Sequence, residues 1–95
     1  MSNMSGTPIT MENGILSVPN DPLVYYIEGD GIGVDITPVM ISVVDAAVSK
    51  AYNGEKQIHW VETLAGEKAF NQTGEWLPKE TLDAMRSGLV SIKGP

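Results

Sequence analysis

Two acidic residues and three glycines are gathered in one short segment, EGDGIG, which runs from Glu28 to Gly33. The carboxylates of Glu28 and Asp30 could bind a hard cation or do acid–base chemistry, and they could equally cap backbone N–H groups at the start of a helix. The glycines could cradle a phosphate, or they could form a tight strand-to-helix turn that requires positive φ.

The glycine spacing departs from the dinucleotide pattern G-x-G-x-x-G, because Val34 stands where the last glycine belongs. The acidic residue expected about 20 positions further on is also missing, since Glu55 lies past a predicted helix and not at a strand end. The ordinary Rossmann pattern is therefore absent.

Two further side chains are candidates for chemistry. Lys93 follows an apolar segment and precedes Gly-Pro, so its ammonium group could bind a carboxylate or phosphate at the edge of a site, or it could be an ordinary solvated lysine. His59 is the single histidine, and it has no second ligand at a metal-binding spacing. We therefore expect His59 to be a packed or exposed side chain.

Apolar periodicity and turn residues predict the elements that must position these residues. We expect a loose leader over residues 1–8 and a hairpin around Asn13-Gly14. Strands are expected at 23–27, 57–63 and 89–92. Between them we expect a helix along the apolar stripe of residues 36–51, a helical turn at 66–70, a loop at 71–75 and a helix from Pro78 to Arg86.

Three helix ends can be read from single residues. Thr37 and Pro38 are either the N-cap and first residue of the long helix, or Pro38 lies in a first turn that begins near Val34. Asn53-Gly54 supplies a left-handed stop, and Gly88 stands where the glycine that ends the last helix belongs.

Strands that alternate with helices are typical of an α/β fold with parallel pairing, in which ligand sites lie at the carboxyl ends of strands. The EGDGIG segment and the Lys93-Gly94-Pro95 segment both follow such strands. Because a domain rarely ends where its site is being built, we expect the chain to be the N-terminal piece of a longer protein.

The composition excludes several classes of protein. The 95 residues suffice for one small domain, and 42% hydrophobic residues argue against a disordered chain. No run approaches the roughly 18 apolar residues of a membrane helix, so we expect no membrane partner. A net charge of −6 would repel a phosphate backbone, so we expect no nucleic acid partner. The lack of cysteine suits a reducing cytoplasm.

Three stretches of the chain resemble the opening part of the large domain of bacterial NADP-dependent isocitrate dehydrogenases. They are IEGDGIGVDITP, VVDAAVSKAYNGEKQIHWVETLAGEKAF and TGEWLPKETLDAMRSGLVSIKGP, and the preceding ITMENGILSVPNDPLVYY resembles the N-terminal hairpin of these enzymes. The resemblance covers residues 9–95. GDGIG is shared with isopropylmalate dehydrogenases of the same superfamily, whereas AGEKAF, GEWLP and the hairpin favour the isocitrate branch.

The resemblance implies a partial isopropylmalate dehydrogenase-like fold, with an N-terminal β-hairpin followed by β-α-β-α-β. It implies oxidative decarboxylation of isocitrate to 2-oxoglutarate with reduction of NADP in the tricarboxylic acid cycle, by a cytoplasmic homodimer that uses Mg²⁺ or Mn²⁺. Lys93 matches a lysine that lines the substrate cleft, Ile32 matches a residue against the nicotinamide end of the cofactor, and Gly31 and Gly33 would shape that turn. It places the catalytic residues and the metal ligands beyond Pro95, so we expect the chain alone to be inactive.

Two alternatives stay open. One is that the chain belongs to a sister enzyme that acts on another 2-hydroxy acid, such as isopropylmalate. The other is that it is a non-catalytic interaction module that borrows surface from a partner.

Overall fold

The structure of this chain is a computed structural model, and it describes residues 6–95. Its elements in chain order are β1 (Thr10–Glu12), β2 (Ile15–Ser17), β3 (Leu23–Ile27), α1 (Gly33–Ala51), β4 (His59–Thr63), α2 (Glu67–Thr73), α3 (Lys79–Gly88) and β5 (Ser91–Lys93). The expected leader spans residues 1–8, and its first five residues lie outside the described residues. Within the rest of it, the Thr7 N–H donates to Asp21 O and the Thr7 carbonyl accepts from Leu23 N–H.

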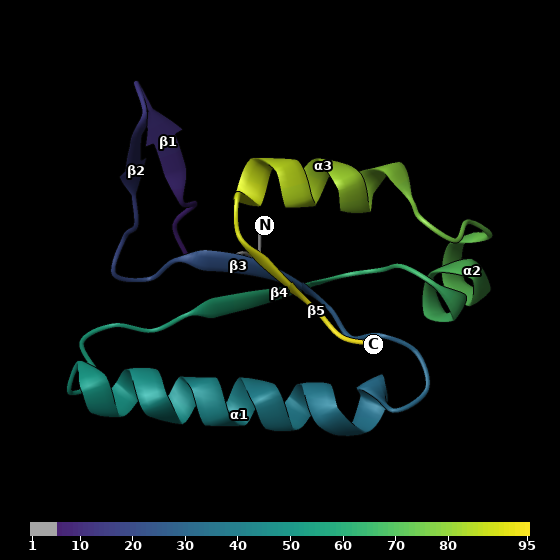
Figure 1. The fold of residues 1–95 in the computed structure, drawn as a ribbon, viewed down its shortest axis with the longest axis horizontal. Helices are drawn as coiled ribbons and strands as arrows, with labels where there is room; N and C mark the ends of the chain where they lie inside the picture. Colours follow the sequence, from purple (N-terminus) through teal and green to yellow (C-terminus); the bar gives the residue numbers. More distant parts are fainter. Residues whose placement is uncertain (1–5) are drawn as a thin grey trace.

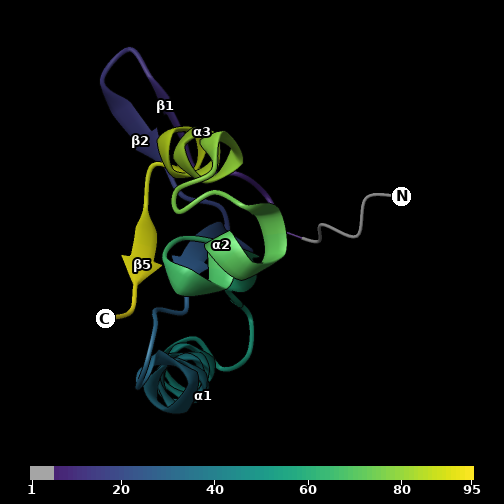
Figure 2. The ribbon, with the colours of Figure 1, turned by 90° about the vertical axis from the view of Figure 1, so that its right-hand side faces the viewer.

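A three-stranded sheet of order β4-β3-β5 forms the centre of the molecule, and both of its pairings are parallel. The helix α1 covers one face of this sheet and α3 covers the other, while α2 lies beyond the carboxyl ends of the strands (Figures 1 and 2). The predicted α/β architecture with parallel pairing is confirmed. Because parallel strands need crossover connections, the helices are a consequence of the strand order.

The predicted hairpin is present as an antiparallel pair of β1 and β2, with Glu12 paired to Ile15. Its two turn residues, Asn13 and Gly14, have φ values of 53° and 77°. A two-residue turn of this kind needs positive φ at both positions, and asparagine and glycine are the residues that adopt it most readily. The hairpin projects from the sheet on the same side as α3 (Figure 2).

The long helix α1 begins at Gly33, so Pro38 lies inside its early turns. Of the two starts predicted for this helix, the one near Val34 is therefore right and the Thr37 N-cap is wrong. Thr37 is buried, and its hydroxyl donates to the carbonyl oxygen of Glu28 at 2.8 Å and does not cap the helix. The helix ends at Ala51, and Asn53 follows at φ 55°, as the predicted left-handed stop requires.

The connection between β4 and β5 holds two helices and differs from the sequence-based expectation at two places. The helix α2 continues to Thr73, so residues 71–73 are helical and not loop, and Gly74 ends the helix in the left-handed conformation. Gly88 lies within α3, and the residue that takes positive φ is Leu89, at 66°. A Cβ on Gly88 would come within 2.6 Å of the Tyr25 ring, so glycine is required there for close packing and not for a turn.

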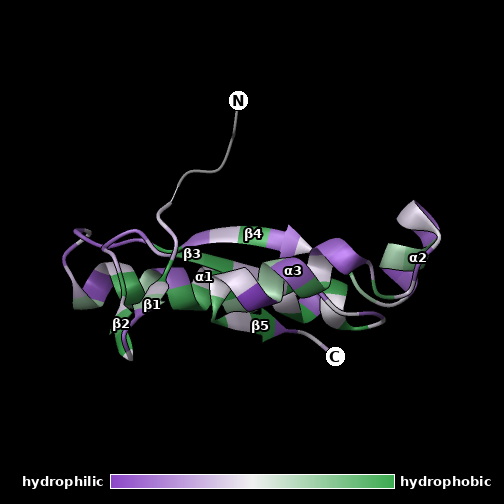
Figure 3. Cartoon of the chain, turned by 90° about the horizontal axis from the view of Figure 1, so that it is seen from above, coloured by the Kyte–Doolittle hydropathy of each residue, from purple (hydrophilic) through white to green (hydrophobic). Residues whose placement is uncertain are grey.

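Little of the apolar surface is buried among the described residues. The buried hydrophobic residues are Ile9, Leu23, Val24, Ile27 and Ala69. The central strand β3 contributes most of them, and much of it carries the hydrophobic colour in Figure 3. Part of the predicted stripe on α1 faces solvent, since Val39 and Val43 are 61% and 62% exposed. No helix in residues 6–95 combines the length and the hydropathy that crossing a bilayer requires.

Candidate functional site

The segments that follow β3 and β5 meet at the carboxyl edge of the sheet. The N–H of Asp30 donates to the carbonyl oxygen of Pro95 at 3.0 Å, and the N–H of Gly94 donates to the carbonyl oxygen of Ile27 at 2.8 Å. The EGDGIG and Lys-Gly-Pro segments, which the sequence places after separate strands, are therefore joined in space. This edge is where open α/β sheets bind ligands.

The backbone carbonyl of Glu28 is the point around which this edge is packed. It accepts the hydroxyl of Thr37 from α1, and the Cα atoms of Gly33 and Gly94 lie so close that a Cβ on either residue would collide with it. Glycine is therefore needed at Gly33 for close approach and not for positive φ. Gly29 and Gly31 do adopt positive φ, at 91° and 61°, which confirms the tight-turn interpretation of this segment at those two positions.

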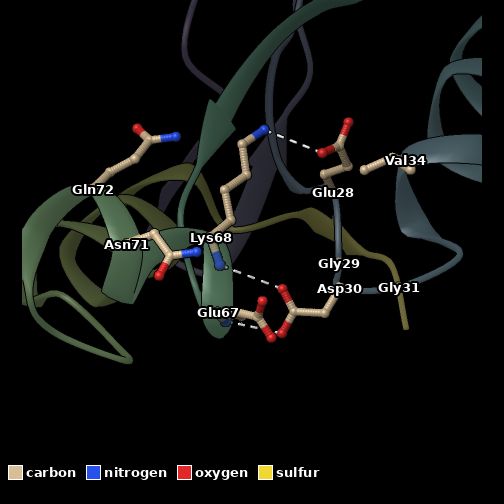
Figure 4. A pocket seen from close by; sticks show the side chains of 9 residues that line it. All are labelled: Glu28, Gly29, Asp30, Gly31, Val34, Glu67, Lys68, Asn71 and Gln72. Carbon is tan, nitrogen blue, oxygen red and sulfur yellow. Dashed lines mark hydrogen bonds and ion pairs between the residues drawn. The ribbon is translucent and has the colours of Figure 1, made fainter.

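An open cleft of about 580 Å³ lies between the loop after β3 and the helix α2, and we call it the α2 cleft. Its lining residues come from both segments, and all of them are drawn in Figure 4: Glu28, Gly29, Asp30, Gly31, Val34, Glu67, Lys68, Asn71 and Gln72. Lys68 is the one basic residue in this lining, and three of the others are acidic. Lys68 therefore carries the one positive charge of the lining, against three negative charges.

The side chains of Glu28 and Asp30 are both engaged across the α2 cleft (Figure 4). The carboxylate of Asp30 accepts the N–H groups of Glu67 and Lys68 at 2.9 Å and 3.4 Å. The ammonium group of Lys68 donates to Glu28 at 3.1 Å and to Glu62, at the end of β4, at 2.6 Å. Asp30 thus caps a helix, as one of the two interpretations of the sequence expects, but the helix is α2 and not the adjoining α1.

Two pKa values are shifted by this cluster. Hydrogen bonds to Glu62 and Glu28 raise the pKa of Lys68 above its ordinary value. Burial, together with the negative charges of Glu62 and Glu28, raises the pKa of Tyr26, which pairs with Glu62 across the sheet. Both shifts favour the protonated forms, so Lys68 is a cation and Tyr26 is neutral throughout the physiological pH range.

A second, smaller cavity of about 70 Å³ lies on the other side of Asp30, and we call it the Lys93 cavity. Residues at or just after the ends of the three strands line it: Ile27, Gly29, Asp30, Ala65, Gly66, Lys93 and Pro95. The side chain of Lys93 is exposed, and its ammonium group donates to the carbonyl oxygen of Gly94 at 2.9 Å. Within residues 6–95 this is the one hydrogen bond of the ammonium group, so further N–H groups remain to bind an anion.

The candidate residues from the sequence are near one another but do not all line one cavity. Gly31 lines the α2 cleft and Lys93 lines the Lys93 cavity, with Asp30 shared between the two. Ile32 is 62% exposed at the start of α1 and lines neither of them. Gly33 is buried beneath the Glu28 carbonyl.

Sequence reasoning missed Lys68 and Glu62 as members of this cluster. Lys68 falls in the segment where a helical turn is predicted, but nothing in its local pattern shows that it faces the end of β3. A usable signal existed in the predicted parallel pairing, because Glu28 and Glu62 both stand at the ends of predicted strands, which the structure shows to be neighbours. Two carboxylates at one sheet edge repel each other, so a cation is expected between them.

The donor set of the site does not fit a metal ion. Within residues 6–95 there is no group of three or more histidine, cysteine, aspartate or glutamate side chains that could hold one. The carboxylates of Glu28 and Asp30 are occupied by Lys68 and by the N–H groups of α2. The arrangement is suited to holding a loop in place and to binding an anion at Lys93.

Comparison with known proteins adds a second, independent line of observation. The sequence model of the isocitrate/isopropylmalate dehydrogenase family matches residues 23–95. The chain is 60% identical over 94 residues to a protein of Pseudomonas aeruginosa named isocitrate dehydrogenase [NADP], covering 96% of this chain and 22% of the relative. It is 55% identical over 92 residues to the protein of the same name from Staphylococcus aureus, covering 97% of this chain and 22% of the relative.

These relatives are far longer than this chain, which spans about a fifth of their length. The family match nevertheless covers most of the 95 residues, including β3, α1, β4, α2, α3 and β5. The chain therefore belongs to the isocitrate/isopropylmalate dehydrogenase family.

Proposed function

We propose that this chain forms the N-terminal part of the large domain of an NADP-dependent isocitrate dehydrogenase, with residues 9–95 as its ordered unit. In that reaction the hydroxyl of isocitrate is oxidised, a hydride passes to NADP, and loss of carbon dioxide gives 2-oxoglutarate. The observation that carries the proposal is the meeting of the EGDGIG and Lys-Gly-Pro segments at one sheet edge, in a chain that matches relatives of this name at 54–60% identity.

The role we propose for Lys93 is to bind a carboxylate of isocitrate. Its ammonium group is exposed at the carboxyl edge and has one recorded partner, a backbone carbonyl. A charge-assisted hydrogen bond from lysine to a carboxylate is among the stronger polar contacts in proteins. Lys93 lines the Lys93 cavity of about 70 Å³ and also a cavity of about 190 Å³ toward Ile36 and Met40 of α1, so space for a small substrate lies beside its side chain.

We propose that Gly31, Ile32 and Gly33 form one side of the cofactor site. The exposed side chain of Ile32 offers an apolar contact to a nicotinamide ring. Gly31 has no side chain, and no atom lies within 4 Å of the position that a Cβ would take there. The backbone at Gly31 is therefore open to an approaching cofactor. Gly33 fixes the start of α1 against Glu28.

The proposal includes Mg²⁺ or Mn²⁺, a divalent ion that supplies Lewis-acid stabilisation of the oxidised intermediate. Because the donor set in residues 6–95 does not fit such an ion, we assign its ligands to polypeptide outside these residues, and no role in this chain is derived from it. The proposal also includes a cytoplasmic homodimer. The apolar side chains exposed along α1 and on the hairpin are surfaces that a larger assembly can bury.

A chimera tests the proposal directly. Residues 1–95 replace the matching segment of the Staphylococcus aureus relative, and NADPH formation is followed with isocitrate and Mn²⁺. We expect activity within about tenfold of the parent enzyme, and we expect none from the 95-residue chain alone. A soluble, folded chimera without turnover, or one that prefers isopropylmalate, would contradict the proposal.

A further inference from the structure

The helix α2 has little apolar packing to hold it in place. It is seven residues long, Ala69 is its one buried residue, and Phe70 is 42% exposed. Isolated helices of this length are marginal in water, because nucleation costs more than a few hydrogen bonds return. Apart from the stacking of Phe70 on Trp76, which follows α2 in the chain, the position of α2 therefore depends on polar contacts with other segments.

The first of these contacts is made by Asp30. Its carboxylate accepts two N–H groups at the start of α2, and its own N–H donates to the carbonyl oxygen of Pro95. Gly66 allows this approach, since a Cβ at that position would collide with the Asp30 carboxylate. One residue of the loop after β3 thus joins α2 to the segment after β5.

The second contact is made by Lys68, whose ammonium group bridges carboxylates at the ends of β3 and β4. The side chain of Lys68 is about one-third exposed and that of Glu28 is 19% exposed, so the bridge is partly shielded from water. If Lys68 were neutral, the charged residues lining the α2 cleft would be Glu28, Asp30 and Glu67, all negative.

We propose that Asp30 and Lys68 are positioning residues that lock α2 to the loop after β3 and keep the α2 cleft able to admit an anionic dinucleotide. Asp30 fixes the loop that carries Gly31 and Ile32, and Lys68 offsets one of the three negative charges in the lining that would repel the phosphates. The locking of α2 stands on the contacts alone, whereas the role toward a dinucleotide rests on the proposed function.

Amide hydrogen exchange in the 95-residue chain tests the lock without any activity. In the first turn of a helix, N–H groups lack partners within the helix, so those of Glu67 and Lys68 are protected only by Asp30. We expect Asp30→Ala to speed exchange at these two amides by about fivefold or more, the loss typical of a helix cap, while amides of α1 are unchanged. Unprotected amides in the parent chain, or protection that survives the substitution, would overturn the lock.

The milder variant Asp30→Asn covers the case in which Asp30→Ala does not fold. It keeps the size and one acceptor oxygen but loses the charge, so we expect a smaller acceleration at the same two amides. Lys79→Met is the matched control for Lys68→Met, because Lys79 pairs with Asp83 at 3.3 Å on an exposed face of α3, away from the α2 cleft. It should leave the Glu67 and Lys68 amides protected.

Kinetics in the chimera test the role toward the dinucleotide. We expect Lys68→Met to raise the KM for NADP roughly tenfold at low salt, and the difference from the parent should narrow as salt screens the exposed carboxylates. Lys68→Arg should restore most of the affinity, and Lys79→Met should have no effect. A KM that does not respond to salt, or no rescue by arginine, would overturn this role. If the parent chimera itself is inactive, the proposed function fails and hydrogen exchange still decides the lock.

Discussion

The hydroxyl of Thr37 donates a 2.8 Å hydrogen bond to the backbone carbonyl of Glu28, which joins the first turns of α1 to the end of β3. Thr37 is only 4% exposed, so its hydroxyl has little access to water. The bond lies where Gly33 and Gly94 pack against the same carbonyl. This polar contact therefore helps to hold the start of α1 against the carboxyl edge of the sheet.

Replacing Thr37 by valine removes the hydroxyl and keeps the shape of the side chain. We expect the free energy of unfolding to fall by about 1–3 kcal/mol, because the Glu28 carbonyl would be left buried without a donor. Urea unfolding followed by circular dichroism measures the change. Thr10→Val, on the exposed strand β1, is the control and should be nearly neutral. Equal effects at the two sites would contradict the importance of the buried bond.

Replacing Leu89 by glycine should stabilise the protein. Leu89 adopts φ 66° and ψ −37° just after α3, a conformation that costs a side chain with a Cβ roughly 1 kcal/mol or more. Its side chain is 45% exposed, so little packing is lost. Asn53→Gly is the comparison, because asparagine tolerates its φ of 55° and should gain less. A lower urea midpoint for Leu89→Gly than for the parent chain would refute the expectation.

The free energy of unfolding should fall above about pH 10 because of Lys68 and Tyr26. The pKa of each group is raised in the folded state, so the folded protein holds both protons more tightly than the unfolded chain does. The resulting stabilisation is complete below the ordinary pKa values of about 10, and it is lost as the pH rises through the raised values. Urea unfolding at a series of pH values should show this decline. The Lys68→Met, Tyr26→Phe double variant should show a flatter profile, and parallel profiles would argue against the assignment.

Replacing Lys93 by methionine should separate function from stability. Because Lys93 is exposed and donates only to Gly94, we expect the free energy of unfolding to change by less than about 0.5 kcal/mol. In the chimera, loss of a charged hydrogen bond worth about 1.5–3 kcal/mol should raise the KM for isocitrate roughly tenfold to a hundredfold. Lys79→Met serves again as the control. An unchanged KM would remove Lys93 from the substrate site.

The sequence predicted β3, the hairpin and the long helix well because their signals are local, whereas the strands expected at 57–63 and 89–92 begin two residues later, at His59 and Ser91. The apolar segment Leu23–Ile27 and the Asn13-Gly14 turn each occur where expected. The errors arose where packing between distant segments overrides local preference. Gly88 lies inside α3 and packs against the Tyr25 ring, which leaves no room for a Cβ, and the Thr37 hydroxyl binds the Glu28 carbonyl and does not cap the helix.

The candidate site divides in the same way. The glycines and Lys93 could be found from the sequence, because each follows a predicted strand. Lys68 could be found only by combining segments, since its partners lie at positions 28 and 62 and the parallel pairing of β3 with β4 brings those two carboxylates together. Charge clusters made by pairing between strands have no signature in any single segment.

The strand order β4-β3-β5 gives each outer strand one neighbour among the described residues. The far side of β4 and of β5 thus presents backbone donors and acceptors that can accept an additional strand. At high concentration we expect isolated copies of the chain to associate by strand pairing along the free sides of β4 and β5. The substitution Ile92→Lys, in the middle of β5, should weaken this association.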